Sequence, residues 1–180
     1  MSALAIEGRA RVLGDDINTD YIISSRRKRD SLDPQILRQY LLESVDPNFA
    51  ETVEPSDILV AGENFGCGSA MEVAATVVIG AGIRAVLAKS FSRTYYRNAI
   101  NNGLLPVVCD TSGINEGDRL SVSLGETFHV RNESTGTDLA AEPLSPVVHA
   151  IVTAGGLVSC FQKHGGFPDL AQSEIHGAKQ

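Results

Sequence analysis

Two side chains that can act as nucleophiles or bases, Cys67 and Ser69, lie at the end of a glycine-rich segment, Gly62–Ser69. An apolar run typical of a strand, 57–61, precedes this segment, and a run typical of a helix, 70–81, follows it. A turn from a strand into a helix presents backbone N–H groups at the helix N-terminus, where they bind an anion or stabilise an oxyanion. We therefore expect the chemistry of the chain to depend on Ser69.

Ser69 also has a purely structural interpretation. With Glu72 it forms the Ser-x-x-Glu pattern of a capping box, in which the serine oxygen accepts a hydrogen bond from the first helical turn. Glycines at 62, 66 and 68 exceed what a cap requires, and they would let a ligand approach the backbone closely. Both interpretations stand, because one hydroxyl can cap a helix and turn toward a ligand when the site is occupied.

The three cysteines, Cys67, Cys109 and Cys160, are odd in number and widely spaced, which argues against a disulfide framework and favours a reducing compartment. The sequence pairs no local histidine with Cys67, so we interpret it as a small residue that fills the turn. A cysteine-dependent hydrolase remains an alternative. Without a Cys-x-x-Cys pair or spaced histidines, we predict no metal ligand and no iron–sulfur cluster in this chain.

The composition limits the class of protein. Of 180 residues, 43% are apolar and 21% are charged, which is typical of a globular domain with a hydrophobic core. A net charge of −7 disfavours nucleic acid as a partner. The sequence shows neither an apolar segment of about 18 residues nor a signal-peptide pattern, so we expect no membrane span and a cytoplasmic location. We expect one domain over residues 1–165 and a polar tail over 166–180.

The elements that must position Ser69 alternate along the middle of the chain. We predict strands at 8–13, 57–61, 84–88 and 105–108, and helices that start at Pro34 and span 70–81 and 91–102. This order favours a parallel α/β unit with ligands at the carboxyl ends of the strands. The last third predicts a hairpin, 119–124 with 127–131, and a helix over 145–154. The fold class is therefore α/β, a mixed sheet with flanking helices.

One run of basic residues could bind an anion. Arg26, Arg27, Lys28 and Arg29 lie in a loop, 24–32, that is either a solvated surface or an anion clamp.

Arg93 and Arg97 are four residues apart on one helix face. Their neighbours Tyr95 and Tyr96 leave little room for a purely solvated helix.

Three segments resemble the small subunits of 3-isopropylmalate dehydratase, within the aconitase swivelling-domain superfamily. They are 14–23 (GDDINTDYII), 62–69 (GENFGCGS) and 88–98 (AKSFSRTYYRN), with 102–106 (NGLLP) after them. The resemblance runs from about residue 8 to residue 110, in the same order and with the same spacing as in that family.

The resemblance implies a swivelling β/β/α domain that works with a large subunit as a heterodimer or heterotetramer. The large subunit would hold a [4Fe-4S] cluster, and the pair would remove and re-add water on a small hydroxy di- or tricarboxylate. Ser69 takes the position of the catalytic base, and Asp20, Arg26 and Gly68 fall at substrate-binding positions. The implied pathway is leucine biosynthesis.

This chain departs from the family pattern beside Ser69. Where relatives continue Gly-Ser-Ser-Arg-Glu-His, it has Ala70 and Met71 in place of the second serine and the substrate-binding arginine, and Val73 in place of the histidine.

The loop departs as well, because Arg27 and Lys28 replace an aromatic and an aliphatic residue. We expect Arg27 and Lys28 to bind substrate, and the substrate arm to be polar or anionic, as in a homoaconitase. A non-catalytic regulatory paralogue is the alternative.

Overall fold

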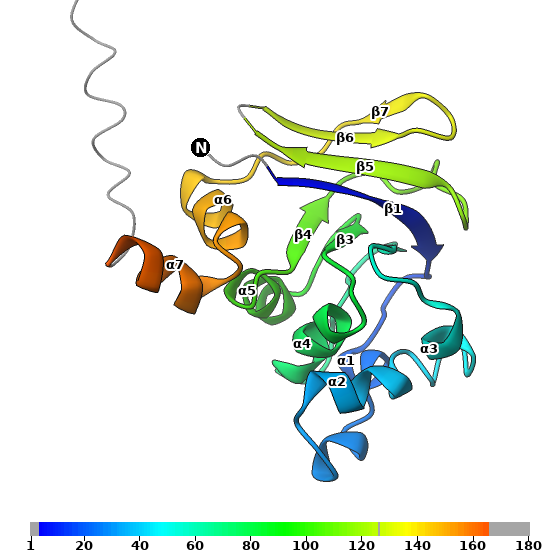
Figure 1. Ribbon diagram of the computed structural model, residues 1–180. Coiled ribbons are helices and arrows are strands. Elements are labelled where there is room, and N and C mark those ends of the chain that lie inside the picture. The colour runs from blue at the N-terminus through cyan, green and yellow to red at the C-terminus, as the bar shows by residue number, and fades with distance from the viewer. Residues whose placement is uncertain (1–3, 126, 166–180) are drawn as a thin grey trace, which may run out of the picture.

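The computed structural model describes residues 4–125 and 127–165, which form one seven-stranded mixed sheet with helices packed against it (Figure 1). Four strands are parallel: β1 (Leu4–Val12), β2 (Ile58–Ala61), β3 (Ala85–Ala88) and β4 (Leu105–Val108). Three are antiparallel: β5 (Arg119–Leu124), β6 (Phe128–Asn132) and β7 (Thr137–Leu139). Across the sheet the order is β4-β3-β2-β1-β5-β6-β7. The predicted α/β class with a mixed sheet is confirmed.

β1 joins the two halves of the sheet. Residues 10–12 pair in parallel with β2, whereas residues 4–9 pair antiparallel to β5. A strand of nine residues is long enough to serve both neighbours in succession. The strand predicted at 8–13 therefore begins four residues earlier than expected.

The helices of the described chain are short. They are α1 (Thr19–Ile22), α2 (Pro34–Leu37), α3 (Phe49–Thr52), α4 (Val73–Gly80), α5 (Arg93–Asn101), α6 (Pro146–Thr153) and α7 (Leu157–His164), with 3₁₀ turns η1 (Arg27–Arg29) and η2 (Arg38–Tyr40). The helix predicted to start at Pro34 ends after one turn and continues as η2. Neither β7 nor α7 was expected. The tail predicted for 166–180 lies outside the described residues.

The parallel strands are buried on both faces. In β2, Leu59 and Ala61 face a core formed with α1, α2 and α4, while Ile58 and Val60 face a second core formed with α6 and α7. α5 contributes to both cores. Strands covered on both faces require continuous apolar runs rather than alternation, which is the pattern of β2 and β3.

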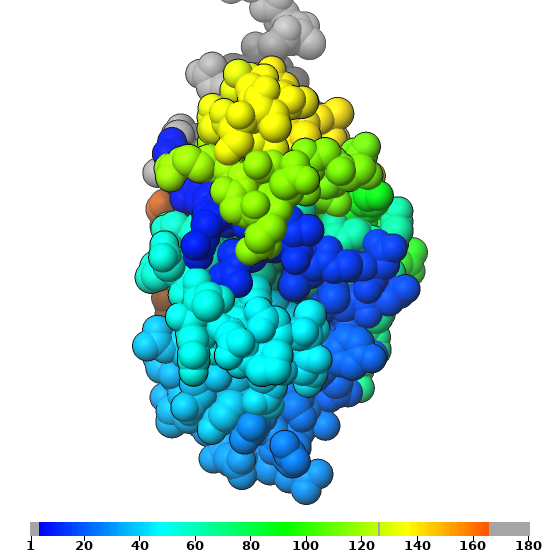
Figure 2. Space-filling view, turned by 90° about the vertical axis from the view of Figure 1, so that its right-hand side faces the viewer, coloured from blue at the N-terminus to red at the C-terminus, as the bar shows by residue number. Residues whose placement is uncertain are grey.

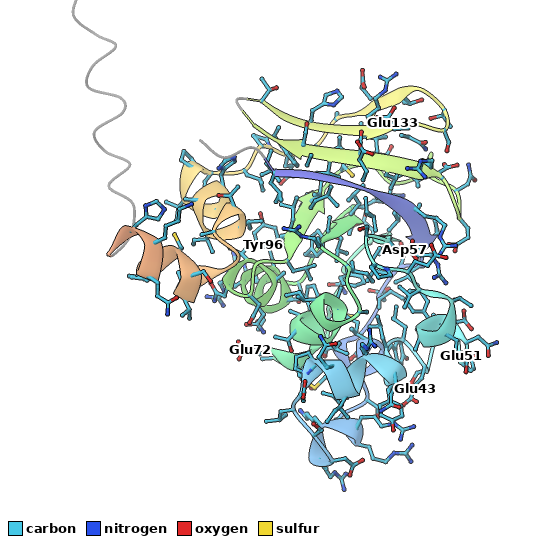
Figure 3. All side chains as sticks on the ribbon, in the orientation of Figure 1. Glu43, Glu51, Asp57, Glu72, Tyr96 and Glu133 are labelled. Carbon is cyan, nitrogen blue, oxygen red and sulfur yellow. The ribbon has the colours of Figure 1, made fainter. Side chains whose placement is uncertain are left out.

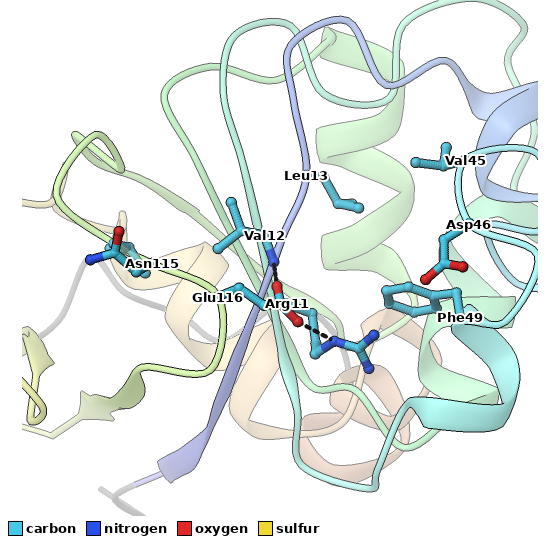
Figure 4. A pocket seen from close by; sticks show the side chains of 9 residues that line it. Arg11, Val12, Leu13, Val45, Asp46, Phe49, Asn115 and Glu116 are labelled. Atoms are coloured by element: carbon cyan, nitrogen blue, oxygen red, sulfur yellow. Dashed lines mark hydrogen bonds and ion pairs between the residues drawn. The ribbon is translucent and has the colours of Figure 1, made fainter.

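A buried arginine fixes the carboxyl end of β1. Arg11 donates to Glu116 (2.9 Å) and to Asp57 (3.5 Å), and its guanidinium lies over the Phe49 ring, 4.4 Å from the centroid (Figure 4). The second oxygen of Glu116 accepts from the backbone N–H of Val12. These contacts hold β1 in place where it leaves the sheet toward the candidate site.

The basic loop 24–32 projects at one end of the molecule, and the strands β6 and β7 form the other end (Figure 1). The space-filling view shows the same separation, with blue residues at the lower end and yellow residues at the upper end (Figure 2). Within residues 4–125 and 127–165, no helix is long and apolar enough to cross a membrane.

Candidate functional site

The Gly62–Ser69 segment lies between two other loops that also follow parallel strands. On one side, backbone bonds join Gly62 N to Gly14 O (3.2 Å), Gly66 N to Ile17 O (2.8 Å) and Thr19 N to Cys67 O (2.8 Å). On the other side, they join Lys89 N to Gly62 O (3.0 Å), Phe65 N to Ser90 O (3.0 Å) and Ser92 N to Phe65 O (2.9 Å). The three motifs that resemble the family therefore meet at the carboxyl ends of neighbouring strands, where α/β proteins bind ligands.

Two glycines in this segment are required by the protein itself. Gly66 has a φ of 77°, and a Cβ there would lie 2.2 Å from the Tyr95 side chain. Gly68 has a φ of 93°, and its Cβ would lie 2.4 Å from the Asn18 side chain. We expected these glycines to admit a ligand. They admit the neighbouring segments, which holds the loop in one conformation, and close approach of a ligand to this backbone stays a prediction.

The prediction that Ser69 caps the following helix is wrong. α4 starts at Val73, its N-cap residue is Glu72, and no side chain caps it. The Glu72 carboxylate instead accepts from Asn102 Nδ2 (3.1 Å). The backbone carbonyl of Ser69 accepts from Thr19 Oγ1 (3.0 Å) and fixes the residue, while its hydroxyl is exposed and bonds to no other described residue. The hydroxyl is therefore available for chemistry.

Ser69 and its two neighbours along the chain have free backbone donors. Within the described residues, the N–H groups of Gly68, Ser69 and Ala70 donate to no acceptor. Successive free N–H groups in a turn that contains a residue of positive φ bind anions. The free donors of the expected anion cradle thus lie in the loop before the helix, and anion binding there, with Gly68 as a contributor, stays a prediction.

Lys28 reaches the position where the family has its arginine. Its ammonium Nζ lies 3.1 Å from the sulfur of Met71, and Met71 N in turn donates to Ser69 O (2.8 Å). A thioether is a weak acceptor, so this contact leaves the ammonium able to pair with a stronger one. Met71 is 5% exposed, so Lys28 brings a cation to an otherwise apolar floor beside Ser69.

The other loop cations differ in their contacts. Arg27 donates twice to Glu43 (2.9 Å each) and lies over the Tyr40 ring at 3.8 Å, so it anchors the loop. Its hydrogen bond with Glu43 raises the pKa of Arg27 above its ordinary value. Arg26 is exposed, and its guanidinium pairs with no described residue. Arg26 and Lys28 therefore remain predicted substrate ligands, while the contacts of Arg27 favour a role in positioning.

Asp20 shapes the start of the basic loop. It lies in α1, and its carboxylate accepts from the backbone N–H of Ser25 (3.1 Å). The N–H of Asp20 donates to Asn18 Oδ1 (2.9 Å). A direct contact between Asp20 and substrate stays a prediction.

The cysteines do not form a cluster site. Cys109 and Cys160 are buried in the second core, and burial, followed by the charge of Asp110, raises the pKa of Cys109 to about 11. In the part of the chain that the structure describes, no group of three histidine, cysteine or acidic side chains could hold a metal ion. These residues do not fit a resident [4Fe-4S] cluster.

Sequence reasoning missed two residues that position the site. Asn18 and Thr19 connect the first motif to Cys67, Gly68 and Ser69 through the contacts described above. The only signal was an Asx-rich turn before an apolar step, and this pattern does not reveal a partner 50 residues away.

Comparisons with known proteins agree with this arrangement. Residues 25–112 match the Aconitase C-terminal domain family. The chain is 45% identical over 162 residues to 3-isopropylmalate dehydratase small subunit 1 of Methanopyrus kandleri, covering 89% of this chain and 94% of the relative. It is 41% identical over 160 residues to the methanogen homoaconitase small subunit of Methanocaldococcus jannaschii, covering 89% and 93%.

A solved structure shares the fold. The crystal structure of 3-isopropylmalate dehydratase from Methanocaldococcus jannaschii superposes with a TM-score of 0.84 at 38% identity, covering 95% of this chain and 99% of that one. With the sequence relatives, this shows that the chain belongs to the 3-isopropylmalate dehydratase small-subunit family, whose members are small subunits of aconitase-type hydro-lyases.

Proposed function

We propose that this chain supplies the base and the carboxylate site of a hydro-lyase whose hydroxy di- or tricarboxylate substrate has an anionic arm. Relatives named for 3-isopropylmalate dehydratase and for homoaconitase are 45% and 41% identical to it, so overall similarity does not separate an apolar arm from an anionic one. The observation that carries the choice is the contact of Lys28 Nζ with Met71 Sδ at 3.1 Å.

Ser69 is proposed as the base. A hydroxyl removes a carbon-bound proton only if its alkoxide is stabilised, and preorganised N–H donors provide such stabilisation at a water-excluded site. The free N–H groups of residues 68–70 belong to Ser69 and its two chain neighbours. The Lys28 ammonium contacts Met71, which is two residues after Ser69 in the chain. Both would also stabilise the charge that develops on the carboxylate side of the substrate.

Lys28 and Arg26 are proposed to bind the carboxylates. An arginine pairs with a carboxylate in a bidentate fork, whereas a lysine offers a point charge at the end of a flexible stem. Because Met71 replaces the family arginine, Lys28 restores the charge from a different segment. An ammonium over an apolar floor would disfavour an isopropyl arm and favour an anionic one.

The site needs a partner. We assign the [4Fe-4S] cluster, which would polarise the substrate hydroxyl, to a large subunit that covers Ser69, in a heterodimer or heterotetramer. The resemblance and the relatives' designation as small subunits support this assignment. A cytoplasmic location is part of the proposal and is supported by three free cysteines in the described chain.

Substitution of Lys28 tests the substrate class. In the reconstituted complex, Lys28→Leu should raise KM for a citrate-like or homocitrate-like acid by roughly 30-fold, because loss of one charged partner costs about 2 kcal/mol. KM for 3-isopropylmalate should stay the same or fall. Absorbance of the unsaturated product measures both. Arg29→Leu is the matched control, since Arg29 is exposed in the same loop and its side chain forms no hydrogen bond or ion pair with a described residue.

Two results would contradict the proposal. If the unaltered complex converts 3-isopropylmalate better than every more anionic acid, the anionic arm is wrong. If no acid of the panel is converted by a complex that assembles, the chain is a non-catalytic paralogue.

A further inference from the structure

A hollow in the surface lies at the start of α5, and Ser69 is not among the residues that line it. It has a volume of about 470 Å³ and is open to solvent, and it is lined by Phe91, Arg93, Tyr96 and Arg97. The two arginines are one helical turn apart, so both project into the same space.

Both arginines lack a partner among the described residues. Neither guanidinium forms a hydrogen bond or ion pair with the described residues, and both side chains are exposed. Four arginines of this acidic chain have carboxylate partners, Arg9, Arg11, Arg27 and Arg131. Arg26, Arg29 and Arg84 also have none among the described residues, so what distinguishes Arg93 and Arg97 is that both line one hollow. Arg93 is moreover the first residue of α5, where the helix dipole disfavours a positive charge. Two like charges held side by side in this way would be stabilised by an external anion.

The aromatic walls of the hollow are fixed. Phe91 stacks against Tyr95, with ring centroids 6.5 Å apart and planes 5° apart, and meets Tyr96 edge-on at 5.9 Å. Tyr96, which Figure 3 labels on α5, packs against the second core. A rigid platform lowers the entropy lost when the arginines bind a partner.

The hollow adjoins the loop that carries Ser69, which the proposed function places under a large subunit. Ser92 precedes Arg93, and its hydroxyl donates to Gly66 O (2.6 Å). Phe91 is bridged to Phe65 in the same loop as Ser69. A partner that closes over exposed Ser69 therefore also lies close to the start of α5.

We propose that Arg93 and Arg97 form a docking site for an acidic segment of the large subunit, whose carboxylates pair with the two guanidinium groups above Phe91 and Tyr96. This inference rests on the proposed function, because it needs the large subunit. Bidentate Arg–carboxylate pairs combine charge with a fixed geometry, which suits recognition between subunits.

Charge reversal tests the docking site. The double variant Arg93→Glu/Arg97→Glu should weaken association of the two purified subunits about 100-fold, since like charges then face each other across the interface. Arg84→Glu is the matched control. Arg84 is also exposed and without a described partner, but it precedes β3, at the amino end of that strand, whereas α5 begins after its carboxyl end. The control should change the dissociation constant less than about threefold.

Folding and catalysis are measured separately. The thermal unfolding midpoint of the isolated chain shows whether the variant folds. If it does not, Arg93→Gln/Arg97→Gln, which keeps the size of the side chains, takes its place and should weaken association about tenfold. At saturating large subunit, KM should be unchanged.

An unchanged dissociation constant in a folded variant overturns the inference. An unchanged constant with a raised KM would show that the hollow binds the small carboxylate substrate instead. Association is measured without turnover. The dissociation constant can therefore be interpreted even if Ser69 proves not to be the base.

Discussion

The parallel and antiparallel halves of the sheet differ in how their side chains are buried. In β2 and β3 every residue is buried, because helices cover both faces. In β5, burial alternates along the strand, so one face lies against the core and the other faces outward. The parallel half thus provides a rigid frame whose carboxyl-end loops can be positioned accurately, whereas the antiparallel half mainly closes the second core.

Charged residues follow the same division. Asp57, 3% exposed, binds Arg9 at 2.8 Å and Arg11 at 3.5 Å at the foot of β2. On the antiparallel half, Asp138 binds Arg131 at 2.6 Å, but its side chain is 60% exposed. Similar ion pairs should therefore contribute very differently to stability in the two halves. Four substitutions compare the halves, two for a serine hydroxyl and two for an ion pair.

The largest difference should come from removing a serine hydroxyl in each half. Ser69→Ala should lower kcat/KM of the reconstituted enzyme by roughly 10²–10⁴-fold, the usual contribution of a positioned base. Ser121→Ala on β5 removes a hydroxyl that donates to Glu133 at 2.6 Å and should leave activity unchanged. Initial rates at saturating large subunit measure both. Equal activity in the two variants would remove Ser69 from the mechanism.

The second-largest effect should come from removing the buried carboxylate of Asp57. Asp57→Ala should destabilise the chain by about 3–5 kcal/mol, because it leaves Arg11 buried without that partner. Urea unfolding, monitored by circular dichroism, measures the change in the free energy of unfolding. Because Glu116 also pairs with Arg11, a loss of less than about 1 kcal/mol would mean that Glu116 alone satisfies the guanidinium.

The smallest effect should come from removing the exposed ion pair between Asp138 and Arg131. The hydrogen bond from Arg131 holds the pKa of Asp138 below its ordinary value. Its contribution to stability is therefore present above the unfolded-state pKa of about 3.9 and is lost as the pH falls through the lower folded-state pKa. Asp138→Asn should shift the urea midpoint at pH 7 only slightly, and the shift should vanish at pH 2. A shift that persists in acid would point to packing rather than charge.

Much of the parallel half could be predicted from the sequence. Continuous apolar runs bounded by glycine and polar turns indicated β2, β3 and β4 within one residue of their observed bounds. The hairpin of β5 and β6 followed from alternation with a period of two. These patterns depend on residues close together in the sequence, so they can be recognised without knowledge of the fold.

The candidate site was less predictable, because its contacts are distant in sequence. The Ser-x-x-Glu pattern predicted a cap at Ser69, but tertiary bonds from Thr19 and a later helix start at Val73 decided otherwise. The contact between Lys28 and Met71 spans 43 residues, and no periodicity encodes it. The position of Ser69 itself came from the family resemblance and from its glycine-rich surroundings.

The attachment of the basic loop 24–32 bears on how specificity can diverge. Arg27 links the loop to Glu43 and Tyr40, and Lys28 links it to Met71, whereas the Ser69 segment is hydrogen-bonded to neighbours on both sides. Changes in one loop can thus alter which acid is bound while the catalytic geometry persists. If Arg26 and Lys28 bind substrate as proposed, this loop is a practical target for redesign of substrate choice.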